Sequence, residues 1–382
     1  MRLLHLSWQN LLAKPLSTLL SLLLLVLGVS IISLLLLLNQ QLTANFNQNI
    51  RGIDMVVGAK GSPLSLILSA VYHIENPTGN IPLAEAEPLL RHPLVQRGIP
   101  LAYGDNYEGY RILGTDSSYL AHYGASLAQG RAWEAPFEVT LGATAAARLG
   151  LAVGDSFYGA HGVAGSDDVH EDHPYRVVGL LGATGTVVDQ LILTGVESVW
   201  DIHAKPGETA DTSARELTAL LLQFRNPAMG FITLTRYINQ QTSMQAALPA
   251  IEINRLLNKL LPIALNTGKG MAFAIMLISA ISVFISLYNS LKERRYELAL
   301  LRSLGASRPQ LLLLLLLEGG LLAALGGGLG LIFSRLGLWL LNATIVADYH
   351  YDMLQWAPLP AEGWLWLATF LIGLLAALIP GL

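Results

Sequence analysis

Four long apolar stretches constrain this chain more than any other feature of its sequence. The first, Leu16–Leu38, has 23 residues and no charged side chain. At about 1.5 Å of rise per residue, a helix of that length crosses a hydrocarbon core of about 30 Å. We place the other spans at Ala264–Leu291, Pro309–Leu331 and Gly363–Leu382. The composition agrees, because the chain is 53% hydrophobic and only 13% charged, which is typical of an integral membrane protein.

A secretory signal peptide is the alternative interpretation of the first stretch. Its apolar region would be shorter, about 7–15 residues, and would precede a cleavage site of small residues. Here the apolar run is longer and leads into Asn39, Gln40 and Gln41, which favours an uncleaved span. At the other end, the chain stops in or just beyond the fourth span without a basic tail, and we expect the natural protein to continue.

The charges between the spans predict the orientation of the chain. Residues 39–262 contain 14 Lys/Arg and 21 Asp/Glu, whereas residues 1–15 and 291–308 together contain 7 Lys/Arg and 2 Asp/Glu. Basic residues favour the cytoplasmic side of a membrane. We therefore predict that the amphipathic segment 1–15, the segment 292–308 and both termini are cytoplasmic. The domain 39–262 and a loop at 335–362 would lie outside.

The external segment 39–262 has the pattern of one mixed α/β domain or of two small subdomains. Short β-like runs alternate with turns, and a longer helix is expected at Met229–Leu261, continuing into the second span. The apolar run Leu64–Val71 could pack between domains or contact the membrane or a partner. His73, close to Glu75, is interpreted as a surface or capping residue. The expected strands are Asp54–Gly58, Tyr110–Gly114, Glu138–Leu141, Ser156–Gly159, Tyr175–Leu181, Gln190–Thr194 and Leu217–Phe224, and the expected helices are Leu83–Leu90, Ser117–Tyr123, Thr144–Leu149 and Ser198–His203.

The charged segment 292–308 lies between two membrane-length stretches and must therefore sit in water. Its pattern predicts a short amphipathic helix that ends at Gly305. Its apolar residues Tyr296, Leu298, Leu301 and Leu304 would be available to a partner. So short a helix has little room for catalysis and is well placed to receive force from another subunit.

The third span is rich in glycine and contains one carboxylate. Small residues let helix backbones approach closely in lipid, so we expect close packing, including across a dimer. Glu318 lies about ten residues into the span, and an intramembrane carboxylate usually faces protein or a cavity. The alternative is that the span starts later and Glu318 lies near the headgroups. The residues assigned to packing are Glu318, Gly319, Gly320, Gly326, Gly327, Gly328 and Gly330.

Three pieces of the sequence resemble the FtsX/MacB-type permeases of ABC systems. The first is Trp8–Leu12, just before the first span. The second is Gly142–Asp155, with the pattern Gly-Ala-x-x-Ala-x-Arg-Leu-Gly-Leu-x-Val-Gly-Asp, followed by Val177-Val178-Gly179. The third is Glu293–Ala306, which runs on to Glu318 and the glycine-rich span. Together the pieces extend over nearly the whole chain.

The resemblance implies four membrane helices and an α/β domain of the MacB periplasmic core type between the first two. It also implies a dimer, either homo- or heteromeric, in a bacterial inner membrane, bound to two cytoplasmic ATPase subunits that hold ATP and Mg²⁺. Segment 292–306 would be the coupling helix. ATP-driven closure would move the external domains through long stalk helices, and substrate need not cross the membrane. The chain has no Walker A pattern of its own and is predicted not to be an enzyme. The residues assigned to coupling are Glu293, Arg294, Arg295, Glu297, Leu298, Leu301, Arg302, Leu304 and Gly305.

A polar loop between two expected strands is the sharpest local feature of the external domain. Three histidines and four carboxylates within thirteen residues offer nitrogen and oxygen ligands for Zn²⁺. The alternative is a solvated hairpin loop, and three small residues there, Gly162, Gly165 and Ser166, argue for flexibility. The chain has no cysteine, which excludes disulfides and thiolate metal sites. The candidate ligands are His161, Asp167, Asp168, His170, Glu171, Asp172 and His173.

Several functions remain open from the sequence. The external motion could serve export, extraction or metal-linked transport, with zinc as a candidate cargo. It could instead activate an external partner, such as a cell-wall hydrolase, which would make the chain a signalling or scaffolding protein. A membrane metalloenzyme built on loop 161–173 is a further rival, but no His-Glu-x-x-His motif supports it. We expect contacts with lipid and with a periplasmic or outer-membrane partner protein, and none with nucleic acid.

Overall fold

The computed structural model describes residues 2–160, 173–203, 215–293, 295–349 and 357–381. Two compact units make up the chain. The helical unit contains the N-terminal residues up to Thr43 and most of the chain from Lys259 onward. The sheet domain contains Ala44–Asn258. Each unit is described by itself below.

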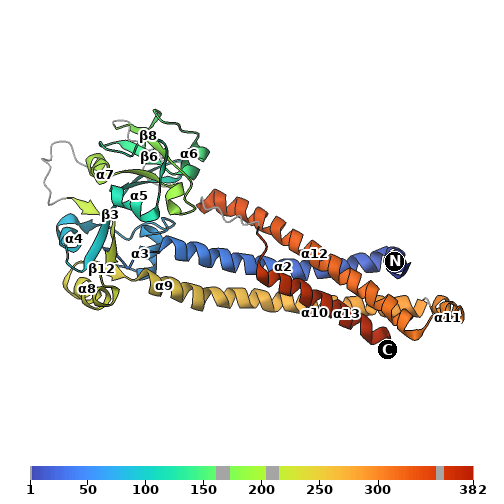
Figure 1. The fold of residues 1–382 in the computed structure, drawn as a ribbon. Coiled ribbons are helices and arrows are strands. Elements are labelled where there is room, and N and C mark those ends of the chain that lie inside the picture. Colours follow the sequence, from blue (N-terminus) through green and yellow to red (C-terminus); the bar gives the residue numbers. More distant parts are fainter. Residues whose placement is uncertain (1, 161–172, 204–214, 294, 350–356, 382) are drawn as a thin grey trace. The chain divides into compact units, whose positions relative to one another are not determined.

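The helical unit consists mainly of long apolar helices, drawn as the long coiled ribbons in Figure 1. Four segments are long and apolar enough to cross a membrane: Pro15–Asn49, Leu265–Glu293, Arg308–Asn342 and Pro360–Leu378. Leu25, Val283, Leu322 and Ala377 are among the buried residues of its core. Its helices are α1 (Arg2–Leu12), α2 (Pro15–Asn49), α10 (Leu261–Glu293), α11 (Arg295–Ser303), α12 (Arg308–Tyr349) and α13 (Pro360–Gly381).

The third long helix extends further than the sequence analysis expected. Residues 335–349, assigned to an external loop, are helical and belong to α12. The apolar pattern does not stop at Leu331, because Leu336, Leu338 and Leu340 continue it on the far side of Arg335. The charge of Arg335 does not end the helix, because it is neutralised inside the helical unit.

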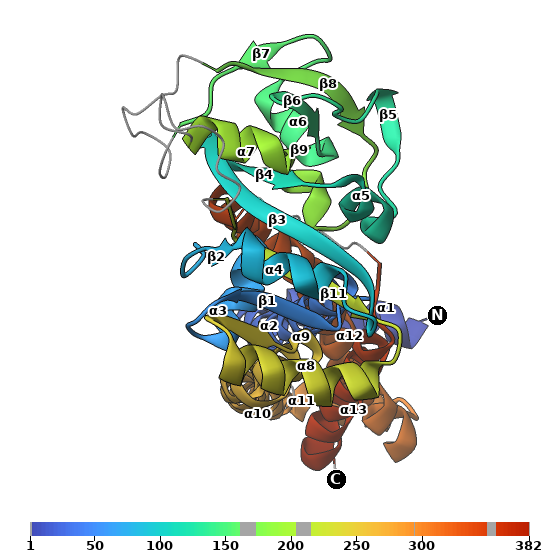
Figure 2. The ribbon, with the colours of Figure 1, turned by 90° about the vertical axis from the view of Figure 1, so that its left-hand side faces the viewer.

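The sheet domain is built on one long mixed sheet with the order β12-β1-β11-β3-β4-β9-β6-β8-β5, and β7 pairs with β8. Strand β3 is the longest, and Figure 2 shows it running between the two halves of the sheet. A separate pair is formed by β10 and β2. The strands are β1 (Met55–Ala59), β2 (Ile81–Pro82), β3 (Val95–Tyr107), β4 (Tyr110–Thr115), β5 (Leu127–Gly130), β6 (Glu138–Leu141), β7 (Ser156–Phe157), β8 (Tyr175–Leu181), β9 (Ile192–Gly195), β10 (Glu216–Leu217), β11 (Ala219–Phe224) and β12 (Met244–Ala247).

Two apolar cores lie along this sheet. The first is centred on residues of β1, β11 and β12, including Met55, Leu220 and Met244. The second is centred on β4, β6 and β8, including Ile112 and Tyr175. The helical elements of the domain are α3 (Pro63–Ala70), α4 (Leu83–Leu90), α5 (Ser117–Tyr123), α6 (Ala143–Leu149), the 3₁₀ helix η1 (Val187–Gln190), α7 (Val196–His203), α8 (Pro227–Gln241), α9 (Pro249–Arg255) and the π-helical segment η3 (Leu256–Leu260).

The ends of the short helices follow from local chemistry. Asp116 is the N-cap of α5, and its carboxylate accepts a hydrogen bond from the backbone N–H of Ser118 at 2.8 Å. Gly124 ends the same helix in the left-handed conformation, at φ 64°. Ser62 is the N-cap of α3, where its hydroxyl oxygen accepts a hydrogen bond from a backbone N–H of the first turn. Pro63 lies in that first turn.

Most expected strands exist, but two expectations for the domain are wrong. The helix expected over Met229–Leu261 is interrupted, because β12 separates α8 from α9. Strand β3 was not expected, since Gly98, Pro100 and Gly104 interrupt its pattern. Pro100 is tolerated because β3 pairs with β11 there, while its pairing with β4 begins only at Ala102.

Candidate coupling helix and its attachment to the spans

Residues Arg295–Ser303, between α10 and α12, form the helix α11 that the sequence predicted. Gly305 follows it with φ at +102°, a left-handed conformation that ends a helix at low cost. The backbone N–H of Leu304 still donates to the carbonyl of Leu300 at 3.0 Å. The helical geometry therefore extends to Leu304.

Three apolar side chains form an exposed stripe on this helix. Tyr296, Leu300 and Leu304 are 83%, 52% and 76% exposed. Because they are spaced four residues apart, they lie on one side of the helix. Arg295 and Arg302 are also exposed, and helical spacing places them away from the stripe. We call Tyr296, Leu300 and Leu304 the α11 stripe.

The other residues assigned to coupling are only partly described. Glu297, Leu298 and Leu301 lie on α11, but the structure does not describe their side chains. Arg294 lies outside the described residues. Glu293, at the end of α10, forms an ion pair with Lys14, which lies between α1 and α2.

A second contact ties α1 to the helix that follows α11. The side-chain amide of Asn10 donates to Oε1 of Glu318 on α12. Nearby, the Ser7 hydroxyl donates to the carbonyl of Leu314 at 3.4 Å. Glu318 is only 2% exposed, so its carboxylate faces protein. The start of the chain is thus attached to helices on both sides of α11.

The glycines assigned to packing lie mostly against helices of the same chain. A Cβ on Gly326 or Gly330 would come within 2.7 Å of the Cβ of Leu25 or Val29 on α2. On another side of α12, a Cβ on Gly319 would meet Ala377 at 2.6 Å, and one on Gly327 would meet Trp366 at 2.8 Å. Gly320 is less tightly packed, with Phe370 at 3.3 Å, and Gly328 faces open space.

An ion pair at another level of the helical unit was missed by the sequence analysis. The guanidinium of Arg335 on α12 binds both carboxylate oxygens of Glu362 on α13, at 2.6 and 2.7 Å. The Ser33 hydroxyl on α2 donates to the same carboxylate at 2.6 Å, and the backbone N–H of Leu359 donates at 2.8 Å. One signal was present, because Arg335 interrupts an apolar stretch and a charge there needs a buried partner.

The proposed metal loop can be judged only at its edge. His161, Asp167, Asp168, His170, Glu171 and Asp172 lie outside the described residues. His173 is described and exposed, and its ring stacks on Phe137 with the centroids 4.9 Å apart. Among the residues that the structure describes, no three His, Cys, Asp or Glu side chains are grouped as metal ligands would be. The zinc site stays a prediction.

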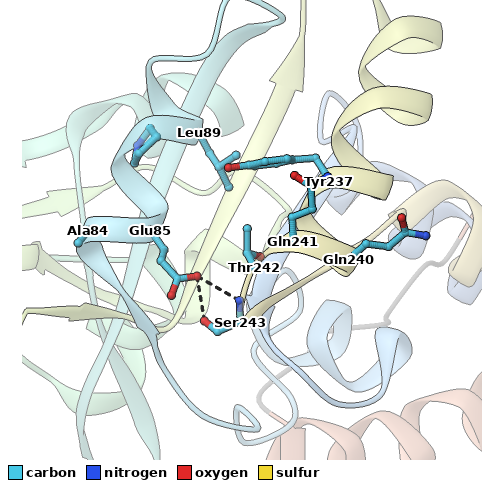
Figure 3. A pocket seen from close by; sticks show the side chains of 9 residues that line it. Ala84, Glu85, Leu89, Tyr237, Gln240, Gln241, Thr242 and Ser243 are labelled. Atoms are coloured by element: carbon cyan, nitrogen blue, oxygen red, sulfur yellow. Dashed lines mark hydrogen bonds between the residues drawn. The ribbon is translucent and has the colours of Figure 1, made fainter.

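A pocket of about 560 Å³ lies between α4 and the end of α8. Figure 3 shows Glu85 and Tyr237 on its walls, with Glu85 bound to the backbone N–H and hydroxyl of Ser243 at 3.1 and 3.0 Å. Its lining contains a single carboxylate, two glutamine amides and no histidine. The carboxylate of Glu85 is thus held by Ser243, which follows α8.

Comparisons with known proteins agree with this arrangement. The family model described as FtsX-like permease C-terminal matches residues 269–382, which include α11 and α12. The model described as MacB-like periplasmic core domain matches residues 18–220, more than half of the chain. No curated relative matches the sequence.

Among solved structures, the periplasmic region of MacB from Actinobacillus actinomycetemcomitans is similar to this chain. The match has a TM-score of 0.38 and 14% identity, and it covers 56% of this chain and 98% of that one. The two family matches decide the assignment and confirm the resemblance read from the sequence. The chain belongs to the FtsX/MacB-type family of ABC-transporter permeases.

Proposed function

We propose that this permease couples ATP hydrolysis by a separate ATP-binding subunit to motion of its sheet domain. The complex would lie in a bacterial inner membrane, with α11 and both termini in the cytoplasm and the sheet domain in the periplasm. Two copies of the permease would pair with two ATPase subunits. Neither ATP nor Mg²⁺ would be bound by this chain.

The exposed α11 stripe carries this proposal. Exposing three large apolar side chains to water is unfavourable. A partner that covers them gains about 1.5–3 kcal/mol of free energy for each side chain that is fully buried. The exposed guanidinium groups of Arg295 and Arg302 lie away from the stripe and offer charged contacts to other parts of the same partner. Through Lys14–Glu293 and Asn10–Glu318, a push on α11 reaches α1, α10 and α12.

The test removes the stripe while leaving the helical unit intact. In Tyr296→Ala/Leu300→Ala we expect more than a tenfold loss of ATPase activity recovered with the tagged chain from its native membranes, because about 1.4 kcal/mol already amounts to tenfold in affinity. Arg295→Glu should act in the same direction. As a matched control, Ile232→Ala removes another exposed apolar side chain, on α8 of the sheet domain, and should leave the recovered activity unchanged. Equal recovery with the parent and the stripe variant would refute the assignment of α11.

Zinc is our proposed candidate for the cargo or for a ligand of the partner. The proposal rests on the three histidines and four carboxylates of residues 161–173. Calorimetric titration of the full chain with Zn²⁺ should show binding at micromolar or tighter affinity. That binding should vanish in the triple variant His161→Ala/His170→Ala/His173→Ala. Identical titrations of parent and variant would remove zinc from the account.

A further inference from the structure

The last turn of α2 is held inside the sheet domain by hydrogen bonds from three separate segments. The hydroxyl of Tyr72 donates to the carbonyl of Phe46 at 2.8 Å. The hydroxyl of Tyr123 donates to the carbonyl of Asn49 at 3.3 Å, and the backbone N–H of Val187 donates to Oδ1 of Asn49 at 3.0 Å. Asn49 is only 1% exposed. We call these five residues the α2 joint.

The chemistry of a helix end explains why such bonds stabilise this turn. The last carbonyl groups of a helix have no partner within the helix and are usually satisfied by water or by a capping turn. Here two of them accept hydrogen bonds from tyrosines of the domain. The side-chain amide of Asn49 also donates to the carbonyl of Asn45 at 3.0 Å, which fixes the orientation of its oxygen toward Val187.

The donors come from both halves of the sheet. Tyr72 lies just after α3, which packs on β1 and β12 in the first half. Tyr123 ends α5, between β4 and β5, and Val187 begins η1, between β8 and β9. The α2 joint therefore contacts elements on either side of β3.

A buried chain of hydrogen bonds lies beside Tyr123 of the α2 joint. The Tyr103 hydroxyl donates to the carbonyl of Ser69, so it accepts from Nδ1 of His73 at 2.6 Å. Nε2 of His73 then accepts from the hydroxyl of Tyr119 at 3.0 Å. His73 and Tyr119 are 8% and 0% exposed, so the surface role expected for this histidine is wrong. The ring of Tyr119 lies against that of Tyr123, with centroids 5.0 Å apart, and connects this chain to the α2 joint.

Without the α2 joint, the connection from α2 to β1 would be a natural hinge. Residues 50–52 form only a turn, and Gly52 has φ at +80°, a conformation that glycine adopts freely. Such turns absorb rotations at low cost. The hydrogen bonds to Phe46 and Asn49 attach the helix itself to the domain, so this attachment does not depend on the 50–52 turn.

We propose that the α2 joint is rigid and fixes the direction of α2 relative to the sheet, with Asn49 as its central positioning residue. Motion of the first span would then turn the sheet domain as a body instead of bending the 50–52 turn. The proposal goes beyond the coupling role of α11. It concerns geometry that exists without ATP, so it can fail while the proposed function stands.

The test measures how tightly α2 is aligned with the domain. Because the chain has no cysteine, spin labels can be placed only where cysteines are introduced, at Gln40→Cys on α2 and Ala147→Cys on α6, both exposed. Gln40 lies nine residues before Asn49, about 13 Å along the helix, so a loosened joint is amplified at the label. Pulsed electron–electron distance measurements on the full chain should give a narrow distribution. Its width should at least double in Tyr72→Phe/Tyr123→Phe and in Asn49→Ala.

A matched variant separates the α2 joint from general stability. Tyr103→Phe also removes a buried hydroxyl of the same domain, but that hydroxyl bonds to His73 and Ser69 and not to α2. It should keep the parent width even if it lowers the melting temperature as much as the joint variants do. An unchanged width in both joint variants would overturn the proposal, and so would equal broadening by Tyr103→Phe.

Discussion

At the residue scale, two buried charges of the helical unit are paired with each other. Arg335 and Glu362 are paired through two parallel hydrogen bonds, and their side chains are 13% and 3% exposed. Ser33 and Leu359 satisfy further lone pairs of the carboxylate. Since one partner alone would leave an unpaired buried charge, such a pair fixes which helices can be neighbours. It joins α2, α12 and α13 at one level of the helical unit.

His73 is the buried polar residue that gives the sheet domain a pH dependence. Burial, and secondly the nearby charge of Arg111, lower the pKa of this histidine from 6.5 to about 3. Between pH 6.5 and about 3, His73 binds a proton in the unfolded chain but stays neutral in the folded domain. The free energy of unfolding therefore falls as the pH drops from 6.5 toward 3. The loss is at most about 1.4 kcal/mol per pH unit. In this window we expect the melting temperature of the parent to fall more steeply than that of His73→Gln.

The comparison with the variant is needed because another histidine acts in the same direction. Burial, followed by the charge of Arg97, also lowers the pKa of His122. That contribution is present in both proteins and cancels in their difference. Parallel curves for the parent and His73→Gln would show that His73 is not kept neutral by the fold.

At the element scale, the sequence identified elements that carry their own local signals. The α11 helix was predicted from its charges and from Gly305, and β8 from the uninterrupted run Tyr175–Leu181. Strand β3 was missed because its Gly and Pro residues are explained only by its contacts with β11 and α4. For example, a Cβ on Gly98 would lie 2.4 Å from the side chain of Leu90. The full length of α12 was missed for a similar reason, since Glu362, the partner of Arg335, lies 27 residues further along the chain.

The glycines of α12 also show what a local sequence pattern can and cannot predict. Their number in one apolar stretch predicts close helix packing. Which helix they face is decided by residues far away in sequence, namely Leu25 and Val29 of α2 and Ala377 of α13. The α2 joint likewise depends on Tyr72, Tyr123 and Val187, which no local pattern connects to the end of a membrane helix.

At the scale of the whole molecule, two connections between the helical unit and the sheet domain lie within described ranges of the chain. The first, α2, is unbroken from Pro15 to Asn49 and ends in the α2 joint. The second contains a π-helical segment, Leu256–Leu260, between α9 and α10. Such segments are wider than a regular helix and often mark functional positions.

The central claim of this account is that ATP hydrolysis by an ATPase subunit bound at α11 moves the sheet domains. It is tested most directly by the distance between two copies of the permease, each labelled at Ala147→Cys, in the purified complex with and without ATP. The account predicts that ATP shifts this distance by more than the width of its distribution, and that Tyr296→Ala/Leu300→Ala abolishes the shift. The same distribution with and without ATP in the parent complex would contradict it.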